Sequence, residues 1–280
     1  MPSSVTSRIN QIKQPRGGFI KPAEMRVEIQ NDNNMLNPEE NVHASIVGMS
    51  VDYLTRFMNG TKAEEAFAIS LKGAKLADEF GFSTAFKIAT ELLRNIKGLD
   101  DNSIINACKL TTFDVWFRNI QGAMMSKTYR ETNPDKATIE NIRTLVERSI
   151  SFISKYGPIT QDGFTFEPIN GKDSDYRKMV ETGKGTFGGY TCTVSSGDGD
   201  FLTKDTMWDF KVTVAEPTNK HTLQLLMYWI MGQHSGRQIF KNITKIGIFN
   251  PRLNKVYLFD IGNVSKETIG IIEKEVICYE

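Results

Sequence analysis

Cysteine and histidine are scarce in this chain. Its 280 residues include three cysteines and three histidines, and the cysteines stand far apart, at Cys108, Cys192 and Cys278. An odd number of cysteines at such spacings forms neither a zinc motif nor a disulfide framework. Their scarcity favours a reducing compartment, and we expect a cytoplasmic protein.

Long apolar runs and an excess of one charge are also missing. No apolar stretch approaches the ~18 residues of a membrane-spanning helix, and the N-terminus lacks the apolar core of a signal peptide. Lysine and arginine (34) balance aspartate and glutamate (33), which leaves a formal net charge of +1. A nucleic-acid-binding surface would therefore have to be a local patch. With 40% hydrophobic residues, the chain can bury a substantial core.

The first 35 residues are polar and punctuated by glycine and proline. Five basic residues stand there against three acidic ones. This composition predicts a flexible N-terminal tail over residues 1–35, with the alternative of an arm that touches nucleic-acid backbone or a partner subunit.

Helical periodicity dominates the next part, residues 36–156. Asn37 before Pro38 and two glutamates is typical of a helix start, so we expect the first helix to begin there. Four further amphipathic helices are predicted over residues 62–79, 83–97, 101–121 and 137–156. The first half of the chain is therefore expected to be mostly helical.

Shorter, β-branched segments replace the helices over residues 157–280. Strands are predicted at 165–168 and 190–194, in a hairpin at 201–202 and 207–214, and in a second hairpin at 244–250 and 255–261, with helices at 174–181, from 219 onward and at 264–275. A helix between two hairpins favours a mixed sheet with a crossover helix packed on one face. The fold class predicted is thus mixed α/β.

Charged residues interrupt the first hairpin. Alternation along its second strand places Asp209 and Lys211 on one face and Trp208 and Phe210 on the other. A carboxylate and an ammonium on an apolar strand are costly to bury unless they are paired or bind a metal. With Asp200 across the hairpin, two carboxylates form a hard oxygen site suited to Mg²⁺ or Mn²⁺, and the lysine could orient or deprotonate a water. The alternative is a neutral ion pair on an exposed sheet face.

The helix after this hairpin carries two polar side chains at (i, i+4) spacing. Gln224 and Tyr228 share one helical face, from which they can reach an active site or a substrate backbone. They could equally form the polar edge of a core helix.

Taken together, Asp200, Asp209-x-Lys211 and Gln224-x-x-x-Tyr228 resemble the motifs of the PD-(D/E)xK nuclease superfamily, in its RecB-type branch. The resemblance implies a restriction-endonuclease-like mixed sheet with flanking helices. It also implies Mg²⁺-dependent (or Mn²⁺-dependent) hydrolysis of DNA. Lys211 would position the attacking water, and Gln224 and Tyr228 would fix the strand being cut.

The resemblance covers roughly residues 157–262, and a glycine, Gly199, stands where the motif often has proline. A nuclease of this type without a helicase motor suggests recombination, repair or defence against foreign DNA or mobile elements. Homo-oligomers or partner proteins of such a system are further expectations. The main rival is a catalytically inactive nuclease fold that binds nucleic acid or protein. A helical assembly factor whose sheet serves dimerisation is a third hypothesis.

Supplementary candidates complete the site. Asp52, one turn after Gly48 on the first helix, is a candidate third metal ligand, although an (i, i+4) ion pair with Arg56 explains it equally well. Glu181 is another candidate acid. Lys220 and His221, in the first turn of the Gln224 helix, are candidates for contacts to a substrate phosphate.

Overall fold

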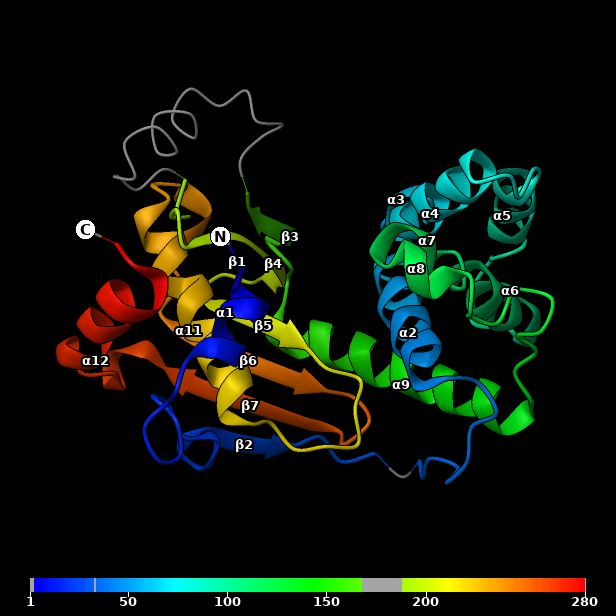
Figure 1. Ribbon diagram of the computed structural model, residues 1–280. Coiled ribbons are helices and arrows are strands. Elements are labelled where there is room, and N and C mark those ends of the chain that lie inside the picture. The colour runs from blue at the N-terminus through cyan, green and yellow to red at the C-terminus, as the bar shows by residue number, and fades with distance from the viewer. Residues whose placement is uncertain (1–2, 33, 168–187, 280) are drawn as a thin grey trace.

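The computed structural model describes residues 3–32, 34–167 and 188–279. These residues form a sheet lobe (3–32, 157–167 and 188–279) and a helical lobe (44–133), which lie on opposite sides of Figure 1. Helix α9 (Lys136–Tyr156) runs from one to the other, because its first half packs in the helical core and Phe152 packs in the sheet core. The predicted fold class, a mixed sheet flanked by helices and accompanied by a helical N-terminal region, is confirmed.

Seven strands of the described chain form one mixed sheet, in the order β1-β4-β5-β6-β7-β2, with β3 paired to β4. The strands β5 and β6 are parallel, and the helix between them supplies the crossover that parallel neighbours require. The strands are β1 (Ser3–Ser4), β2 (Arg26–Ile29), β3 (Gln161–Phe166), β4 (Val194–Leu202), β5 (Thr206–Phe210), β6 (Lys245–Asn250) and β7 (Lys255–Asp260).

The crossover helix, α11 (Asn219–His234), packs on one face of the sheet, and α9 covers the other. Met207 of β5 lies in the core on the α11 side. Its neighbour Trp208 points to the α9 side, where its ring lies 4.8 Å from that of Phe152. Gly247 on β6 makes room for this indole, since a Cβ there would lie 2.3 Å from it. Alternation along β5 therefore divides the two cores.

The prediction of a flexible tail over residues 1–35 is wrong. β1 pairs with β4, β2 pairs with β7, and helix α1 (Val5–Gln11) packs against α11. Four apolar residues of this segment are buried in the sheet core: Val5, Ile9, Ile20 and Met25. They are too widely spaced among polar residues to show a period, and only pairing with distant strands buries them. The sheet is therefore not confined to residues 157–280.

The helical lobe contains α2 (Ala44–Met58), α3 (Ala63–Ala66), α4 (Ala68–Glu79), α5 (Ala85–Arg94), α6 (Asp101–Thr111), α7 (Asp114–Arg118) and α8 (Ile120–Ala123). The single helix predicted over residues 101–121 is thus divided into three. The first helix begins at Ala44 and not at Asn37, because the amide of Asn37 bonds to α9 instead of capping α2. His43 caps α2 by accepting the N–H of Ser45.

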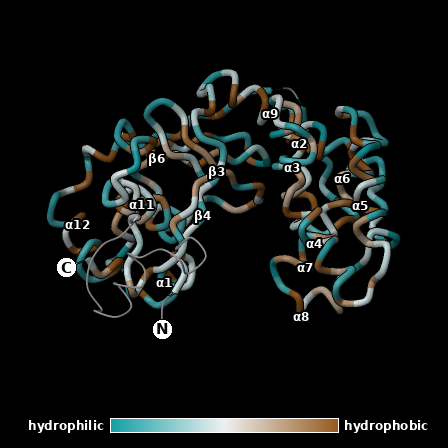
Figure 2. The backbone as a smooth tube through the Cα atoms, turned by 90° about the horizontal axis from the view of Figure 1, so that it is seen from above, coloured by the Kyte–Doolittle hydropathy of each residue, from teal (hydrophilic) through white to brown (hydrophobic). Residues whose placement is uncertain are grey.

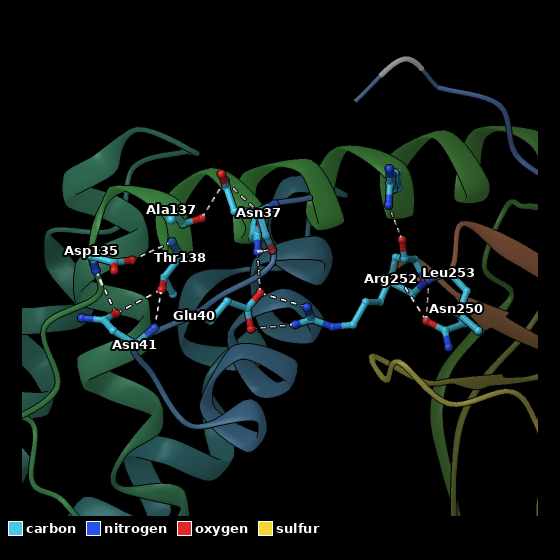
Figure 3. A network of polar contacts seen from close by, with 12 residues as sticks. Asn37, Glu40, Asn41, Asp135, Ala137, Thr138, Asn250, Arg252 and Leu253 are labelled. Atoms are coloured by element: carbon cyan, nitrogen blue, oxygen red, sulfur yellow. Dashed lines mark hydrogen bonds and ion pairs between the residues drawn. The ribbon is translucent and has the colours of Figure 1, made fainter. Parts of the chain in front are cut away.

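Two ion pairs connect the sheet lobe to α2 and to the segment that precedes it. Arg252, in the β6–β7 turn, binds Glu40 through two contacts of 2.9 Å, and both side chains are largely buried (Figure 3). Arg56 of α2 lies 3.0 Å from Asp162 of β3. The sheet lobe is thereby held to these two segments at separate places.

The chain after β7 forms α12 (Lys266–Ile271), which continues as a π-helix over Ile272–Ile277, close to the predicted 264–275 helix. Short 3₁₀ helices occupy Pro22–Glu24, Gln238–Phe240 and Ile261–Asn263. The predicted 174–181 helix lies outside the described residues. No helix within the described ranges is long and apolar enough to span a membrane.

Candidate metal and catalytic site

The β4–β5 hairpin brings Asp200 and Asp209 together. Phe201 pairs with Trp208 and Leu202 with Met207, so the same register sets Asp200 opposite Asp209. The backbone pairing of β4 with β5 ends at Phe201 and Trp208, and beyond it the side chain of Asp200 accepts the Phe210 N–H through Oδ2 at 2.6 Å. Both carboxylates lie on the face of the sheet that α11 covers, as the alternation predicts.

Asp209 is buried, with 6% of its surface exposed, and the two oxygens of its carboxylate differ. Oδ1 lies 2.9 Å from Lys211 Nζ, whereas Oδ2 has no hydrogen-bond partner among the described residues. A buried charged oxygen without a donor is costly, typically by 1–3 kcal/mol or more. The alternative of a neutral pair on an exposed sheet face does not fit this burial.

Burial and neighbouring charges shift the pKa values of Asp200 and Lys211. Burial, followed by the nearby Asp209 carboxylate, raises the pKa of Asp200 to about 7. Asp200 is partly exposed by surface area but closely surrounded by protein, and the raised pKa reflects that dense environment. Burial alone would lower the pKa of Lys211, yet Asp209 and Asp200 raise it above its usual value. Lys211 is therefore a cation, suited to hold a water or offset negative charge but not to accept a proton.

The helix α11 places Gln224 and Tyr228 over this face. Gln224 Nε2 donates to the Tyr228 hydroxyl at 3.1 Å, as the (i, i+4) spacing allows. The tyrosine packs against Gly197 of β4, where a Cβ would lie 2.7 Å from its ring. Burial raises the pKa of Tyr228, and the carboxylates of Asp209 and Asp200 add to the rise, so its hydroxyl stays protonated. Tyr228 is buried and Gln224 half-buried, and the charges of the two acids act on the tyrosine hydroxyl.

Asp52, the candidate third ligand, forms an ion pair within its own helix. Its carboxylate lies 3.0 Å from Arg56, so the alternative of an (i, i+4) ion pair is confirmed. No group of three or more His, Cys, Asp or Glu side chains within the described ranges is arranged to hold a metal ion. A Cβ on Gly48 would only touch the Val212 side chain at 3.8 Å, so this glycine serves no close backbone approach. Glu181 lies outside the described residues.

Lys220 and His221, the two candidates for phosphate contacts, have different surroundings in the structure. Lys220 Nζ points toward α1, where it donates to Asn10 Oδ1 at 2.8 Å. His221 Nδ1 accepts the N–H of Thr218 at 3.0 Å, which requires an unprotonated Nδ1. Burial first, and the Lys211 charge second, lower the pKa of His221. The neutral ring therefore carries its proton on Nε2, which makes His221 the better placed donor.

The sequence analysis did not predict the contact between Arg56 and Asp162 or the small cavity beside it. Arg56 contacts both Asp52 and Asp162, and it lines this cavity between the lobes together with Phe201 and Phe210. Nothing in the local pattern of β3 distinguishes Asp162, because its partner lies more than a hundred residues earlier in the chain.

Gly199 has a packing role that the sequence did not reveal. The Phe164 ring fills the space where a Cβ would stand, 1.9 Å away. This contact explains the glycine at the position where the nuclease motif often has proline. No protein-family model, curated protein or solved structure matches this chain.

Proposed function

We propose that this protein is a metal-dependent deoxyribonuclease of the PD-(D/E)xK type, which binds Mg²⁺ or Mn²⁺ through Asp200 and Asp209. The observation that carries the proposal is the buried Oδ2 of Asp209, which has no donor within the described residues and adjoins a second carboxylate. If Asp209 served only in a structural ion pair, both of its carboxylate oxygens would have hydrogen-bond partners. In a site that binds a metal ion, one oxygen remains available to the ion.

The donor set fits a hard divalent cation. Mg²⁺ is commonly held by one or two carboxylates, with waters and substrate phosphate oxygens completing its shell, so two acids suffice without a third protein ligand. The pKa of Asp200 is raised first by burial and then by the Asp209 carboxylate, and a cation would relieve this second contribution. When bound, such a metal acidifies a coordinated water and stabilises charge on a phosphate.

The remaining side chains suit a phosphodiester substrate. The Lys211 ammonium, held by Asp209, can position a water and offset the charge that develops on the phosphorane-like transition state. Tyr228 and Gln224 are neutral hydrogen-bonding groups that can hold the strand being cut. The Nε2–H of His221 can donate to a phosphate oxygen.

The choice of DNA, and of recombination, repair or defence against foreign DNA as the process, rests on the motif resemblance. Assembly into a homo-oligomer or with partner proteins belongs to the same proposal. The rival, an inactive nuclease fold that only binds nucleic acid or protein, differs in one respect. Such a module has no need of two adjacent acids, one of them buried, that repel each other.

Substitution of Lys211 tests the proposal. The variant Lys211→Ala is expected to lower the rate of Mg²⁺-dependent DNA cleavage about 10²–10³-fold, because a charged group that stabilises the transition state is lost. Lys245→Ala is the matched control, since Lys245 forms a 2.7 Å pair with Asp205 at the other end of the same strands. This control is expected to cleave like the wild type.

Two results would contradict the nuclease assignment. One is cleavage by Lys211→Ala at the wild-type rate. The other is DNA binding that persists in chelator while neither Mg²⁺ nor Mn²⁺ yields product, which would favour the non-cleaving module.

A further inference from the structure

A second candidate site lies in the helical lobe, away from the hairpin. A cavity of about 310 Å³ opens between the ends of α4 and α7 and the segment after α8. This volume is at the lower end of the ~300–1,000 Å³ range of ligand pockets. Nothing in the catalytic proposal makes use of it.

Aromatic rings form its walls. Phe82 and Trp116 lie 4.8 Å apart, and Tyr129 stacks on Phe113 with 5.9 Å between ring centroids. Trp116 is buried, but 50% of the Phe82 surface is exposed. A flat ring entering the cavity could therefore stack on Phe82 without displacing the core.

The backbone around Phe82 is held in place although its ring is exposed. The N–H of Phe82 bonds to the carbonyl of Ala77, and its own carbonyl accepts the N–H of Ala85. Asp78 accepts two backbone N–H groups at the start of α5. Thr84, a β-branched residue at the cavity, is kept at φ +87°, a left-handed conformation that such residues rarely adopt. The exposed ring is thus preorganised by its loop.

The charged residues that line the cavity are basic, and one carboxylate, that of Glu131, lies beside them and accepts the N–H and the hydroxyl of the lining residue Thr128. Among the described lining residues, the charged side chains are Lys127 and Arg130, and neither forms an ion pair within the described part of the chain. The Arg130 guanidinium lies 5.4 Å from the Tyr129 ring centroid. Hydroxyl groups of Ser83, Ser126 and Thr128 complete the lining. Aromatic walls with a basic rim complement a flat base attached to a phosphate.

Apolar surface continues outside the cavity. Exposed apolar side chains that do not line it occur at the end of α4, on α7, on α8 and just after α8: Phe80, Phe117, Ile120 and Met125. Hydrophobic segments are visible beside α8 in Figure 2. A purely apolar patch would suit a protein partner, but the two basic lining residues and the aromatic cavity favour nucleic acid.

We infer that this cavity binds an unpaired nucleotide of a nucleic-acid strand, with its base stacked on Phe82 and its phosphate near Lys127 and Arg130. The inference rests on the proposed nuclease function, because it assigns single-stranded nucleic acid, or duplex with unpaired ends, as the substrate class. The catalytic hairpin would then cut a strand that the helical lobe holds.

Binding in the absence of cleavage tests this assignment. The full chain carrying Lys211→Ala, in chelator, is titrated into a fluorescein-labelled oligothymidylate and followed by anisotropy. Adding Phe82→Ala is expected to weaken binding about tenfold, the loss typical of one base stacked on an aromatic ring. Phe117→Ala is the matched control, because Phe117 is a 46% exposed phenylalanine of the same lobe that does not line the cavity. Its affinity is expected to stay within about twofold.

A probe without bases separates stacking from charge. An abasic oligomer with the same phosphates is expected to bind as weakly as oligothymidylate binds to Phe82→Ala, and Phe82→Ala should not weaken it further. Lys127→Gln should weaken both probes and reduce the salt dependence of binding. Equal affinity of the wild-type cavity for the two probes would overturn the stacking role.

Other occupants give different results. Displacement of the strand by free thymidine monophosphate at comparable affinity would show a mononucleotide site and overturn the strand assignment. Self-association that Phe82→Ala abolishes in sedimentation, with oligothymidylate binding unchanged, would show a protein interface instead. Failure of the nuclease proposal is distinguishable. In that case no metal supports cleavage, whereas Phe82-dependent binding of unpaired bases persists.

Discussion

Two buried carboxylates, one in each lobe, are treated differently by the fold. Asp114 of α7 is completely buried, and its oxygens accept hydrogen bonds from Tyr53 at 2.6 Å and Ser70 at 2.5 Å, with Arg118 3.6 Å away. Asp209 is nearly as buried, but one of its oxygens has no donor within the described ranges. The hydrogen bonds to Asp114 offset part of the cost of burying its carboxylate. A buried oxygen left without a partner keeps capacity for a ligand, at a cost in stability.

The largest expected difference between the two acids is in activity. Asp209→Asn should lower metal-dependent DNA cleavage at least about 10³-fold, since it removes a proposed ligand and the anchor of Lys211. Its thermal unfolding midpoint without metal should stay close to that of the wild type, because the loss of an unsatisfied buried charge offsets the loss of the partner of Lys211. Cleavage rate and thermal unfolding measure the two effects. A strongly destabilised Asp209→Asn with normal cleavage would make Asp209 structural.

Substitution of Asp114 should have the opposite effects, with stability lowered and cleavage per folded molecule kept. Asp114→Ala is expected to lower the free energy of unfolding by about 3 kcal/mol, because Tyr53 and Ser70 lose their acceptor in a buried site. Urea unfolding followed by circular dichroism measures the loss. Asp101→Ala is the control, since Asp101 forms an exposed ion pair with Arg143 and its removal should cost under about 1 kcal/mol. If folded Asp114→Ala lost cleavage activity, Asp114 would not be purely structural, and the distinction between the acids of the two lobes would fail.

The smallest expected effect is on pH dependence. Burial raises the pKa of Asp114, although Ser70 and Tyr53 oppose the rise. A carboxyl with a folded pKa above its unfolded value stabilises the fold fully below the unfolded pKa, and this contribution is lost as pH rises through the folded pKa. The stability advantage of the wild type over Asp114→Asn should therefore shrink as pH rises from about 4. Urea unfolding across pH measures this difference, and an advantage that grows with pH would indicate a lowered pKa.

Local patterns predicted the hairpin and its helix because their contacts are close in sequence. The turn at residues 203–205 sets the strand register, which places Asp200 opposite Asp209. Alternation places Lys211 beside Asp209, and the helical repeat places Gln224 beside Tyr228. Each relation spans few residues and follows from backbone geometry alone.

Contacts between segments far apart in the sequence determined the features that the local patterns did not predict. The first residues join the sheet because β7 and β4 offer them edges, and Asp52 forms an ion pair with Arg56. The cavity around Phe82 forms where several short helices end, a place that periodicity describes poorly.

By itself, the sequence determined the mixed α/β class, the register of the acidic hairpin and the faces on which its polar side chains lie. These features depend on repeats of two or 3.6 residues and on a short turn. Only the tertiary structure decided which charges found partners, because pairing across the lobes depends on how distant segments meet. That is why the orphan oxygen of Asp209, on which the proposed chemistry depends, could be recognised only in the folded molecule.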